Sequence, residues 1–465
     1  MVFSSMIFLW LFMPIVLIVY YVFGRSKIYI KNMILLLSSI FFYAWGEPVY
    51  IYLMILSIIF NYFFGLMINT SSRKLFLFLD IFCNLAVLSY FKYCNFLIGI
   101  INFLFQTNIS DREIALPIGI SFFTFQAMSY VIDVYREECP VEKNIFNVAL
   151  YISFFPQLIA GPIIKYKDIG CQIKNRRETL DGIALGMRRF CYGLGKKVII
   201  SNALAEVVDK IAVMDIGNVD GSMAWIIVIF YSLQIYYDFS GYSDMAIGLG
   251  RIFGFDIPEN FQYPYLSTTI NEFWRKWHIS LGTWFREYVY IPLGGNRKGS
   301  GRTYINLFIV FLLTGIWHGA SWNFVFWGAY HGFFIIMERL GIDKILKKSS
   351  VFSHVYTVCV FGIGWIFFRF TSMRQGFAYL KRIFVPWKYT YAQYSIFEIV
   401  SHRAWMILIL AIAGCGIVQG IAAKYFDIQR FKAGKLDLIY CTVIVWICFG
   451  LLAGNTYNPF IYFRF

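Results

Sequence analysis

The sequence predicts an all-α polytopic membrane protein, and three observations support this fold class. The chain of 465 residues is 59% hydrophobic and only 14% charged, whereas an average soluble domain is about 45–50% apolar and about 25% charged. Apolar stretches long enough to cross the roughly 30 Å hydrocarbon core recur, for example residues 3–23, 49–68, 225–239 and 305–316, the last two with their flanks. Short basic clusters separate the stretches. We expect about eleven transmembrane helices plus re-entrant and interfacial helices around a central cavity.

The basic clusters indicate the orientation of the chain in the membrane. They occupy residues 25–31, 71–74, 174–190, 193–197 and 295–302. Such Lys and Arg excess is typical of cytoplasmic loops. Because the clusters do not lie along one amphipathic face, the net charge of +15 does not indicate a nucleic-acid partner. The first apolar stretch has a basic cluster only after it and no small-residue cleavage pattern, so we expect an uncleaved anchor with its N-terminus outside.

The chain is predicted to form a single domain, 1–465, in three successive parts. Residues 1–110 supply N-terminal helices, 111–340 the core and 341–465 the C-terminal helices. In the first part, the apolar stretch 33–45 ends at Gly46-Glu47-Pro48 and is too short to span the bilayer unaided. We expect a re-entrant or broken segment there, surrounded by protein or by a water-filled cavity.

The core carries polar residues inside apolar stretches. Residues 116–136 and 154–166 contain Pro and Gly together with Gln126, Asp133 and Gln157. Pro and Gly in such segments indicate either a kink with close helix approach or a helix break that lines a cavity. On the second interpretation the three polar side chains line that cavity.

In residues 238–301 glycine, proline, charged and aromatic residues follow one another so closely that we do not expect a single transmembrane helix there. Within them apolar residues recur at helical spacing and form a stripe. Three basic residues lie largely off this stripe: Arg275, Lys276 and Arg286. The stripe consists of Trp274, Trp277, His278, Leu281 and Phe285. A basic, tryptophan-rich helix is expected to lie at the headgroup level of a membrane. We expect its stripe to carry His278 inward.

Two further histidines lie in the apolar stretch "TGIWHGASWNFVFWGAYHG", residues 314–332, which has no acid, lysine or arginine. A buried imidazole is unfavourable without partners, and ionisable groups at membrane depth usually mark a functional site. Histidine also suits proton transfer near neutral pH. His318 and His278 are therefore candidate catalytic residues, with structural imidazoles that bind neighbouring helices as the alternative. His331 would lie on a largely different helix face from His318.

Several other kinds of site are excluded. The sequence contains no G-x-S-x-G serine elbow, no phosphate-binding G-x-x-x-x-G-K-[ST] loop and no H-E-x-x-H zinc helix. Its nine cysteines include no C-x-x-C pair, so neither a disulfide framework nor a thiolate metal site is expected. We expect no metal site.

Four motifs resemble those of the membrane-bound O-acyltransferase family, in its alginate O-acetyltransferase-like branch. They are "DFSGYSDMAIGLGRIFGF", "NFQYPYLSTTINEFWRKWHISLGTWFREYVYIPLGGNRKG", "FFPQLIAGPI" and "LTGIWHGASWNFVFWGAYHG". The resemblance covers most of the chain. It implies a central catalytic cavity in which the histidine of "WHG" is His318. The second family histidine, in "FWRRWHISLS", is His278 here, within "FWRKWHISLG".

The resemblance implies acyl transfer from a thioester to a hydroxyl. His318 would be the general base, an effect typically worth roughly 10²–10⁴ in rate. His278 would either polarise the thioester carbonyl or relay the proton, and indole or backbone N–H groups would stabilise the oxyanion. Besides the three polar residues of the core, the expected cavity lining consists of Trp274, Trp277, Trp317 and Asn323.

The resemblance also implies the partners. The acyl donor would be acetyl-coenzyme A or an acylated carrier protein on the cytoplasmic side, with no permanently bound cofactor. Arg297, Lys298 and Arg302 would steer this anionic donor. The acceptor would be a polysaccharide or an extracytoplasmic partner acetyltransferase, with the chain in the bacterial cytoplasmic membrane. Two alternatives stay open: D-alanyl transfer to teichoic acid, and a glycan or lipid transporter or flippase, which would be expected to show internal symmetry.

Overall fold

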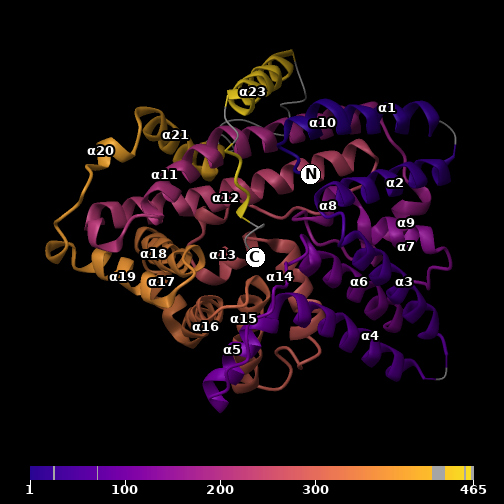
Figure 1. The fold of residues 1–465 in the computed structure, drawn as a ribbon, viewed down its shortest axis with the longest axis horizontal. Helices are drawn as coiled ribbons and strands as arrows, with labels where there is room; N and C mark the ends of the chain where they lie inside the picture. Colours follow the sequence, from indigo (N-terminus) through magenta and orange to yellow (C-terminus); the bar gives the residue numbers. More distant parts are fainter. Residues whose placement is uncertain (25–26, 71, 421–434, 455–456, 462–465) are drawn as a thin grey trace. The chain divides into compact units, whose positions relative to one another are not determined.

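The computed structural model describes residues 1–24, 27–70, 72–420, 435–454 and 457–461. Parts of two basic clusters, at positions 25–26 and 71, and parts of the expected C-terminal region, 421–434, 455–456 and 462–465, lie outside the described residues. Throughout the described ranges the regular structure is helical, and the sole strand-like pairing is an isolated bridge between Phe261 and Trp277 (Figure 1). The all-α prediction is confirmed.

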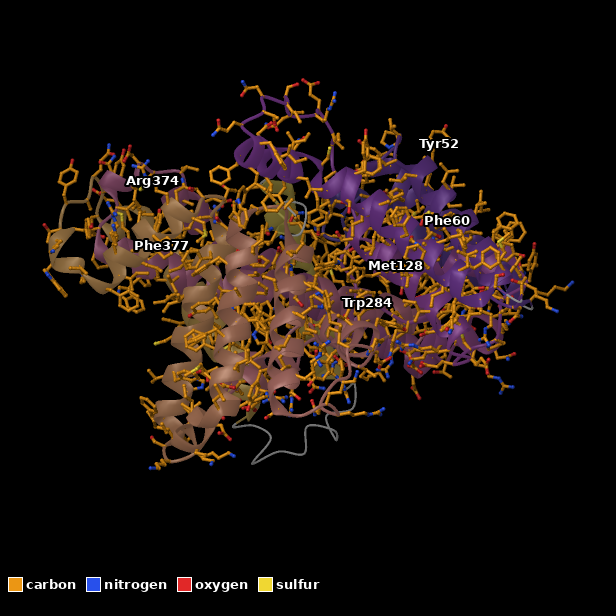
Figure 2. All side chains as sticks on the ribbon, turned by 90° about the horizontal axis from the view of Figure 1, so that it is seen from below. Tyr52, Phe60, Met128, Trp284, Arg374 and Phe377 are labelled. Carbon is orange, nitrogen blue, oxygen red and sulfur yellow. The ribbon has the colours of Figure 1, made fainter. Side chains whose placement is uncertain are left out.

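Six described helical stretches are long and apolar enough to cross a membrane: Ile28–Gly46, Arg73–Phe105, Gly221–Ile252, Ser350–Arg369, His402–Gly420 and Asp437–Gly454. Two shorter apolar stretches are Phe8–Phe23 and Ile51–Met67. Large apolar side chains such as Tyr52 are exposed (Figure 2), as expected where lipid covers a protein surface. The polytopic membrane fold is therefore confirmed, while the number of about eleven spans stays a prediction.

The contacts divide the described chain into two compact units. Unit 1 comprises residues 1–191 and 242–258. Within it α3 packs against α6 and α7, and α2 packs against α7. Its helices are α1 (Met13–Phe23), α2 (Ile28–Gly46), α3 (Ile51–Met67), α4 (Arg73–Leu88), α5 (Cys94–Phe105), α6 (Ile120–Tyr135), α7 (Ile145–Ser153), α8 (Phe155–Leu158), α9 (Tyr166–Asn175) and most of α10 (Leu180–Gly195).

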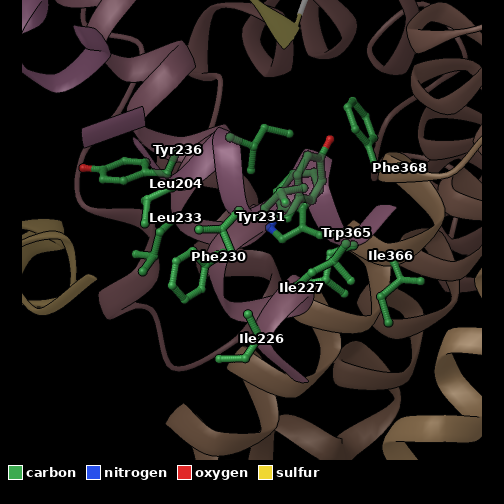
Figure 3. Close-up of a cluster of buried hydrophobic side chains, with 14 of the residues drawn as sticks. Leu204, Ile226, Ile227, Phe230, Tyr231, Leu233, Tyr236, Trp365, Ile366 and Phe368 are labelled. Atoms are coloured by element: carbon green, nitrogen blue, oxygen red, sulfur yellow. The ribbon is translucent and has the colours of Figure 1, made fainter. Parts of the chain in front are cut away.

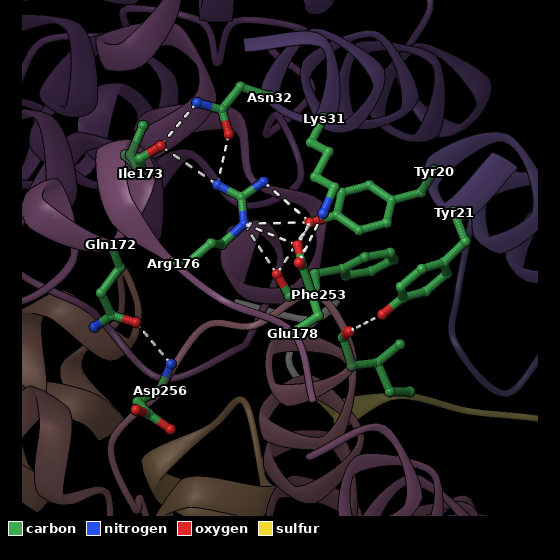
Figure 4. A network of polar contacts seen from close by, with 11 residues as sticks. Tyr20, Tyr21, Lys31, Asn32, Gln172, Ile173, Arg176, Glu178, Phe253 and Asp256 are labelled. Atoms are coloured by element: carbon green, nitrogen blue, oxygen red, sulfur yellow. Dashed lines mark hydrogen bonds and ion pairs between the residues drawn. The ribbon is translucent and has the colours of Figure 1, made fainter. Parts of the chain in front are cut away.

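Helix α2 is longer than the apolar pattern predicted. The expected re-entrant segment 33–45 is instead part of a 19-residue helix that begins at Ile28, so that prediction is wrong. The helix includes polar residues because unit 1 supplies their partners: Lys31 Nζ lies 2.7 Å from Glu178 Oε2, and Asn32 Nδ2 donates to the carbonyl of Ile173 at 2.9 Å. Arg176 donates to Asn32 Oδ1 at 2.6 Å and completes this network (Figure 4).

The two proline- and glycine-containing stretches of the core contain helix breaks. Pro117 and Gly119 precede α6, and Gly119 has a φ of 78°, a conformation that favours glycine. In the second stretch α7 ends at Ser153, the four-residue helix α8 follows, and residues 159–165 are not helical. None of the three prolines, Pro117, Pro156 and Pro162, kinks a continuous helix, because each lies in the first turn of a helix or outside the helices, where its missing N–H is tolerated.

Unit 2 comprises residues 192–241 and 259–465. Its buried apolar cluster includes Phe230 of α12 and Trp365 of α18 (Figure 3). The helices are α11 (Asn202–Ala212), α12 (Gly221–Ile252, up to Gly241), α13 (Ile270–Lys276), α14 (Ile279–Phe285), α15 (Ser300–His318), α16 (Trp322–Met337), α17 (Asp343–Leu346), α18 (Ser350–Arg369), α19 (Met373–Phe384), α20 (Ile396–Ile399), α21 (His402–Ile412) and α23 (Lys435–Gly454).

A buried ion pair connects α12 to a segment near the C-terminus within unit 2. Lys197 Nζ lies 2.5 Å from Asp238 Oδ1, and both side chains are almost fully buried. Asp238 Oδ2 accepts from the backbone N–H of Ile461 at 2.8 Å, and Lys197 also donates to the carbonyl of Pro459. The charges are thus satisfied by each other and by backbone groups, as buried charges require.

The predicted amphipathic helix through His278 is interrupted. Helix α13 ends at Lys276, α14 begins at Ile279, and His278 between them has a left-handed φ of 46°. The expectation of one continuous helical stripe from Trp274 to Phe285 is therefore wrong. A positive φ is uncommon for a residue other than glycine, and such strained positions cluster at functional sites.

Candidate active site

Unit 2 contains a cavity of about 570 Å³ whose lining includes both His278 and His318. The two histidines are 2% and 4% exposed. The lining is drawn from α13, α14, the helical turn Arg286–Tyr290, α15, the end of α16 and the turn that follows it. It consists of Asn271, Trp274, Arg275, Trp277, His278, Ile279, Leu281, Gly282, Thr283, Phe285, Arg286, Tyr290, Asn296, Leu307, Val310, Phe311, Thr314, His318, Ile335 and Arg339. The fold thus brings together the two histidines that the sequence places far apart.

His318 is the last residue of α15, and the close packing of α15 on α16 places it. A Cβ added at Gly315 would collide with the carbonyl oxygen of Phe324 and lie 3.0 Å from the Cα of Gly328. A Cβ at Gly328 would likewise collide with the carbonyl oxygen of Phe311. Small residues let two backbones approach this closely. The glycines of the "TGIWHGASWNFVFWG" stretch therefore determine where the end of α15, and with it the imidazole, lies.

Aromatic rings surround the His318 imidazole. The ring centroids of Trp317, Trp327 and Phe368 lie 5.0, 5.2 and 5.0 Å from it. Trp317 also lies 6.2 Å from the ring of His278, so one indole contacts both candidate catalytic residues. These rings leave the imidazole almost fully buried.

The protonation state of His278 follows from its contact with Asn260. Asn260 Oδ1 accepts from the backbone N–H of Ser280 at 3.1 Å, so this atom is the amide oxygen and acts only as an acceptor. His278 Nδ1 lies 3.2 Å from the same oxygen and must therefore carry the proton. Nε2 is left with its lone pair and is buried without a hydrogen-bond partner among the described residues.

Burial keeps this imidazole neutral. His278 lies between two seven-residue helices, and its desolvation lowers the pKa from 6.5 to about 3, because a low-dielectric site disfavours the charged form. A neutral imidazole with its proton on Nδ1 is able to accept a proton at Nε2 and unable to donate one from there.

A single carboxylate fixes the cavity wall formed by α13. Glu338 accepts from the backbone N–H groups of Ile270 and Asn271 at 2.6 and 2.9 Å, which are unpaired groups at the start of α13. Thr269 Oγ1 caps the same helix by accepting from Glu272 N at 3.0 Å. Helix α13 is thus held at both its cap and its first turn, and it presents Trp274 and Trp277 to the cavity.

Three arginines also line this cavity: Arg275, Arg286 and Arg339. All three are exposed, unlike the two histidines. Sequence reasoning placed Arg275 and Arg286 on the polar side of an interfacial helix and did not consider Arg339. No spacing in the sequence connects the three, since they lie on separate elements that only the tertiary fold brings around one cavity.

Unit 2 holds a second cavity, of about 260 Å³, whose lining includes a ring that packs against His318. Its lining includes Phe324 and Phe368, and the Phe368 ring packs against His318. Two buried polar atoms that have no hydrogen-bond partner among the described residues belong to its lining, Gln234 Oε1 and Ser321 Oγ. His318 itself belongs to the lining of the larger cavity and not to that of the smaller one.

The remaining predicted lining residues lie in several places. Trp274 and Trp277 line the larger cavity, as expected. Asn323 instead donates from Nδ2 to the carbonyl of Phe370 at 2.5 Å and lines neither cavity. The polar residues predicted from the core stretches are fully buried within unit 1: Gln126 and Asp133 on α6, and Gln157 on α8. They do not belong to the lining of the larger cavity.

The predicted steering residues and the third histidine lie outside the cavity lining. Arg297, Lys298 and Arg302 are exposed, and the first two follow Asn296, which does line the cavity. His331 is buried beside the rings of Trp274 and Trp327, each 4.9 Å away. Among the residues described, neither of its ring nitrogens has a hydrogen-bond partner, so it packs as an aromatic side chain behind the cavity wall.

Comparison with known proteins identifies the family of the chain. The sequence pattern of the membrane-bound O-acyltransferase family matches residues 140–380, which include both histidines. The chain is 37% identical to the probable alginate O-acetylase of Pseudomonas putida over the whole of both chains. It is 34% identical to the peptidoglycan O-acetyltransferase of Helicobacter pylori over 82% of this chain and 79% of that protein. The teichoic acid D-alanyltransferase of Bacillus subtilis is 28% identical over 46% of this chain and 56% of that protein.

Proposed function

Because the chain belongs to the membrane-bound O-acyltransferase family, we propose that it transfers an acetyl group from a cytoplasmic thioester donor toward hydroxyl groups of an extracellular polysaccharide, through a partner protein. The observation that carries the proposal is the cavity of about 570 Å³ that His278 and His318 line together. Acyl transfer to a hydroxyl needs a base at a water-poor site with room for the thioester. The cavity offers both.

His318 acts as the general base in this proposal. A hydroxyl is a poor nucleophile until its proton is removed. As the proton passes to the imidazole, the hydroxyl oxygen bonds to the acyl carbon, and the carbon–sulfur bond then breaks. The leaving thiolate takes up the proton. The glycine-mediated packing of α15 on α16 supports this role, because it holds the imidazole in one position.

His278 relays the proton. Its Nδ1 proton is engaged with Asn260, so Nε2 has no proton with which to polarise a thioester carbonyl. The lone pair on Nε2 is able to accept a proton and to release it again. Of the two roles inferred from the family, the geometry therefore supports relay over polarisation. The oxyanion would be stabilised by N–H groups of the cavity wall, for which the indoles of Trp274 and Trp277 are candidates.

Access from two sides is part of the proposal. Moving a polar thioester donor or a polysaccharide hydroxyl into hydrocarbon costs much free energy. Each substrate therefore needs a polar path to the site from its own side of the membrane. The larger cavity would take the donor. The smaller cavity, of about 260 Å³, would take the hydroxyl, with Gln234 Oε1 and Ser321 Oγ as groups that bind it. The packing of Phe368 between the smaller cavity and His318 makes this ring the element that must move for the two sides to connect.

The relatives favour acetyl over D-alanyl as the transferred group. Identity to the alginate O-acetylase extends over the full length at 37%, whereas identity to the D-alanyltransferase is 28% over 46% of the chain. Membership of an acyltransferase family leaves the transporter or flippase alternative without support.

The test is a transfer assay with the purified chain in proteoliposomes. Labelled acetyl-coenzyme A and a D-alanyl carrier protein are supplied separately, together with a polysaccharide acceptor and the extracts that contain a partner enzyme. We expect label to reach the polysaccharide from the acetyl donor, and His318→Ala to lose this transfer. Transfer from the D-alanyl donor alone would contradict the acetyl assignment. Retention of more than about a tenth of the rate by His318→Ala would remove His318 as the base.

A further inference from the structure

The C-terminal segment, residues 457–461, is held inside unit 2 by two carboxylates. At its start, Tyr457 donates from its hydroxyl to Asp209 Oδ2. At its end, the backbone N–H of Ile461 donates to Asp238 Oδ2 at 2.8 Å. Hydrogen bonds to an ionised carboxylate are stronger than those between neutral groups. The segment is therefore fixed at both ends by groups of α11 and α12.

Both ends of the C-terminal segment also reach the smaller cavity. Asp209, which binds the start of the segment, accepts from Arg369 Nη2 at 2.7 Å with its other oxygen. Arg369 is the last residue of α18 and belongs to the lining of the smaller cavity. Ile461, at the other end, belongs to the same lining. The segment thus supports one lining residue through Asp209 and supplies another directly.

The polar groups of this lining match a ligand that is rich in hydroxyl groups. Gln234 Oε1 and Ser321 Oγ are buried without a hydrogen-bond partner among the described residues. A guanidinium has five N–H donors, and within the described part of the chain that of Arg369 donates only to Asp209. A hydroxyl both donates and accepts, so it is able to pair with all three side chains. Because Asp209 balances the charge of Arg369, the lining favours a neutral hydroxyl-rich ligand over a phosphate.

We propose that Arg369 binds the acceptor in the smaller cavity and that residues 457–461 are its positioning segment, an inference that rests on the proposed function. The ligand class is a neutral sugar unit with several hydroxyl groups. The guanidinium donates to a sugar oxygen, while Gln234 and Ser321 accept from sugar hydroxyls. Tyr457 acts through Asp209, because a carboxylate held on one oxygen presents the other to the guanidinium in a fixed orientation.

The experiment measures how fast N-ethylmaleimide labels a thiol placed in the smaller cavity. Thr371 is an exposed residue of the lining, and Thr371→Cys introduces the thiol. Labelling of position 371 in the purified full-length chain is read by peptide mass spectrometry, so the nine native cysteines do not contribute. The probe is methyl α-D-glucopyranoside. We expect it to slow the labelling, because a sugar bound in the cavity covers position 371.

Substitutions of the polar groups are then made in this Thr371→Cys chain. Arg369→Gln should raise the probe concentration for half protection about threefold or more, through the loss of its hydrogen bonds. Arg369→Lys should keep part of the protection, because it keeps a charged donor without the planar fork. Tyr457→Phe should shift protection in the same direction as Arg369→Gln. The matched control is Tyr237→Phe, which loses a hydrogen bond to the carbonyl of Ala411 outside both cavities and should leave protection unchanged.

A second pair of substitutions tests the apolar end of the segment. Ile461 and Ile407 are buried to a similar degree in the same apolar cluster, at 5% and 7% exposed, but only Ile461 lines the smaller cavity. Ile461→Ala should therefore speed the labelling of position 371 about twofold or more in the absence of probe. Ile407→Ala should leave that rate unchanged. Equal rates in the two variants would remove Ile461 from the lining.

Each contrary result identifies what fails. Absence of protection in the parent Thr371→Cys chain would overturn the hydroxyl-binding cavity and with it the proposal. Protection that is equal in Arg369→Gln and the parent would overturn the role of Arg369. Equal losses in Tyr457→Phe and Tyr237→Phe would indicate a general loosening of unit 2 and overturn the positioning role. If Arg369→Gln does not fold, Arg369→Lys is judged by the same criterion. Failure of the proposed function would be seen separately, as absence of His318-dependent transfer in proteoliposomes.

Discussion

His278 Nδ1 lies 3.2 Å from Asn260 Oδ1, and the same oxygen accepts from the backbone N–H and the hydroxyl of Ser280 at 3.1 and 2.9 Å. One amide oxygen thus sets the tautomer of the imidazole and also holds the start of α14. Partners of this kind orient a functional histidine and fix which nitrogen is reactive.

Replacing Asn260 should affect the pH profile as well as the rate. We expect Asn260→Leu to lower kcat about tenfold or more, because the imidazole loses its fixed tautomer. Asn260→Asp keeps an acceptor for Nδ1 and adds a negative charge, which favours the protonated imidazole. The acid limb of its pH–rate profile should therefore move to higher pH, with more activity than the leucine variant. Equal losses in both variants with unshifted profiles would mean that Asn260 only supports the fold.

The three histidines of the site region should differ in their contributions. His318→Ala should reduce transfer by roughly 10²-fold or more, because it removes the base, while the chain stays inserted and monodisperse. His278→Ala should also reduce the rate severely. His331→Ala, outside the cavity lining, should matter less. The measurement is initial transfer rate for each purified variant, with size-exclusion profiles as the folding control. The same loss for all three would indicate structural roles.

The close approach of α15 and α16 gives a prediction about stability. Gly315→Ala places a Cβ against the carbonyl oxygen of Phe324, and such overpacking costs roughly 1–3 kcal/mol. We expect a lower unfolding temperature and a loss of transfer, because the displaced end of α15 carries His318. Gly301→Ala is the matched control in the same helix, since nothing lies within 4 Å of its added Cβ. A wild-type unfolding temperature for the Gly315 variant would argue against tight packing here.

The exposed cations after Asn296 should act through long-range attraction. Neutralising Arg297, Lys298 and Arg302 together should weaken donor use mainly at low ionic strength, because exposed charges are screened beyond about 10 Å at 0.1 M salt. The measurement is transfer rate against donor concentration at two salt levels. The comparison for nonspecific charge effects is K344Q/K348Q/R374Q, which neutralises three exposed cations of unit 2 that line neither cavity. A donor dependence equal to wild type at both salt levels would remove these residues from the donor path.

Sequence alone predicted the fold class, which is confirmed, and it singled out the two histidines that line one cavity, whose catalytic roles stay a prediction. Both inferences depend on strong local signals. Long apolar stretches require helices in a membrane, and an imidazole in an apolar stretch is costly. The break between α13 and α14 at Trp277 and His278 was missed because the apolar spacing of Trp274 to Phe285 satisfies a continuous helix equally well. Helix α2 was predicted too short because Lys31 and Asn32 look like a helix end until Glu178 and Ile173 are placed beside them.

The arginine cluster could not be predicted for a different reason. Arg275, Arg286 and Arg339 have no shared spacing, and each has polar or charged neighbours in the sequence. Only the tertiary arrangement shows that Glu272 and Glu338 are already engaged and that the three arginines line one cavity. The order of residues in the sequence does not show which charged side chains lack an ion-pair partner in the folded chain.

Glu338 and Arg339 are consecutive residues, and this adjacency links two parts of the site mechanically. Glu338 holds the first turn of α13 through Ile270 and Asn271, while Arg339 lines the cavity next door. Two consecutive residues therefore reach the same cavity by different routes, one by holding the helix that carries Trp274 and the other by lining the cavity itself. A shift of the backbone at this one place would change both parts of the wall together.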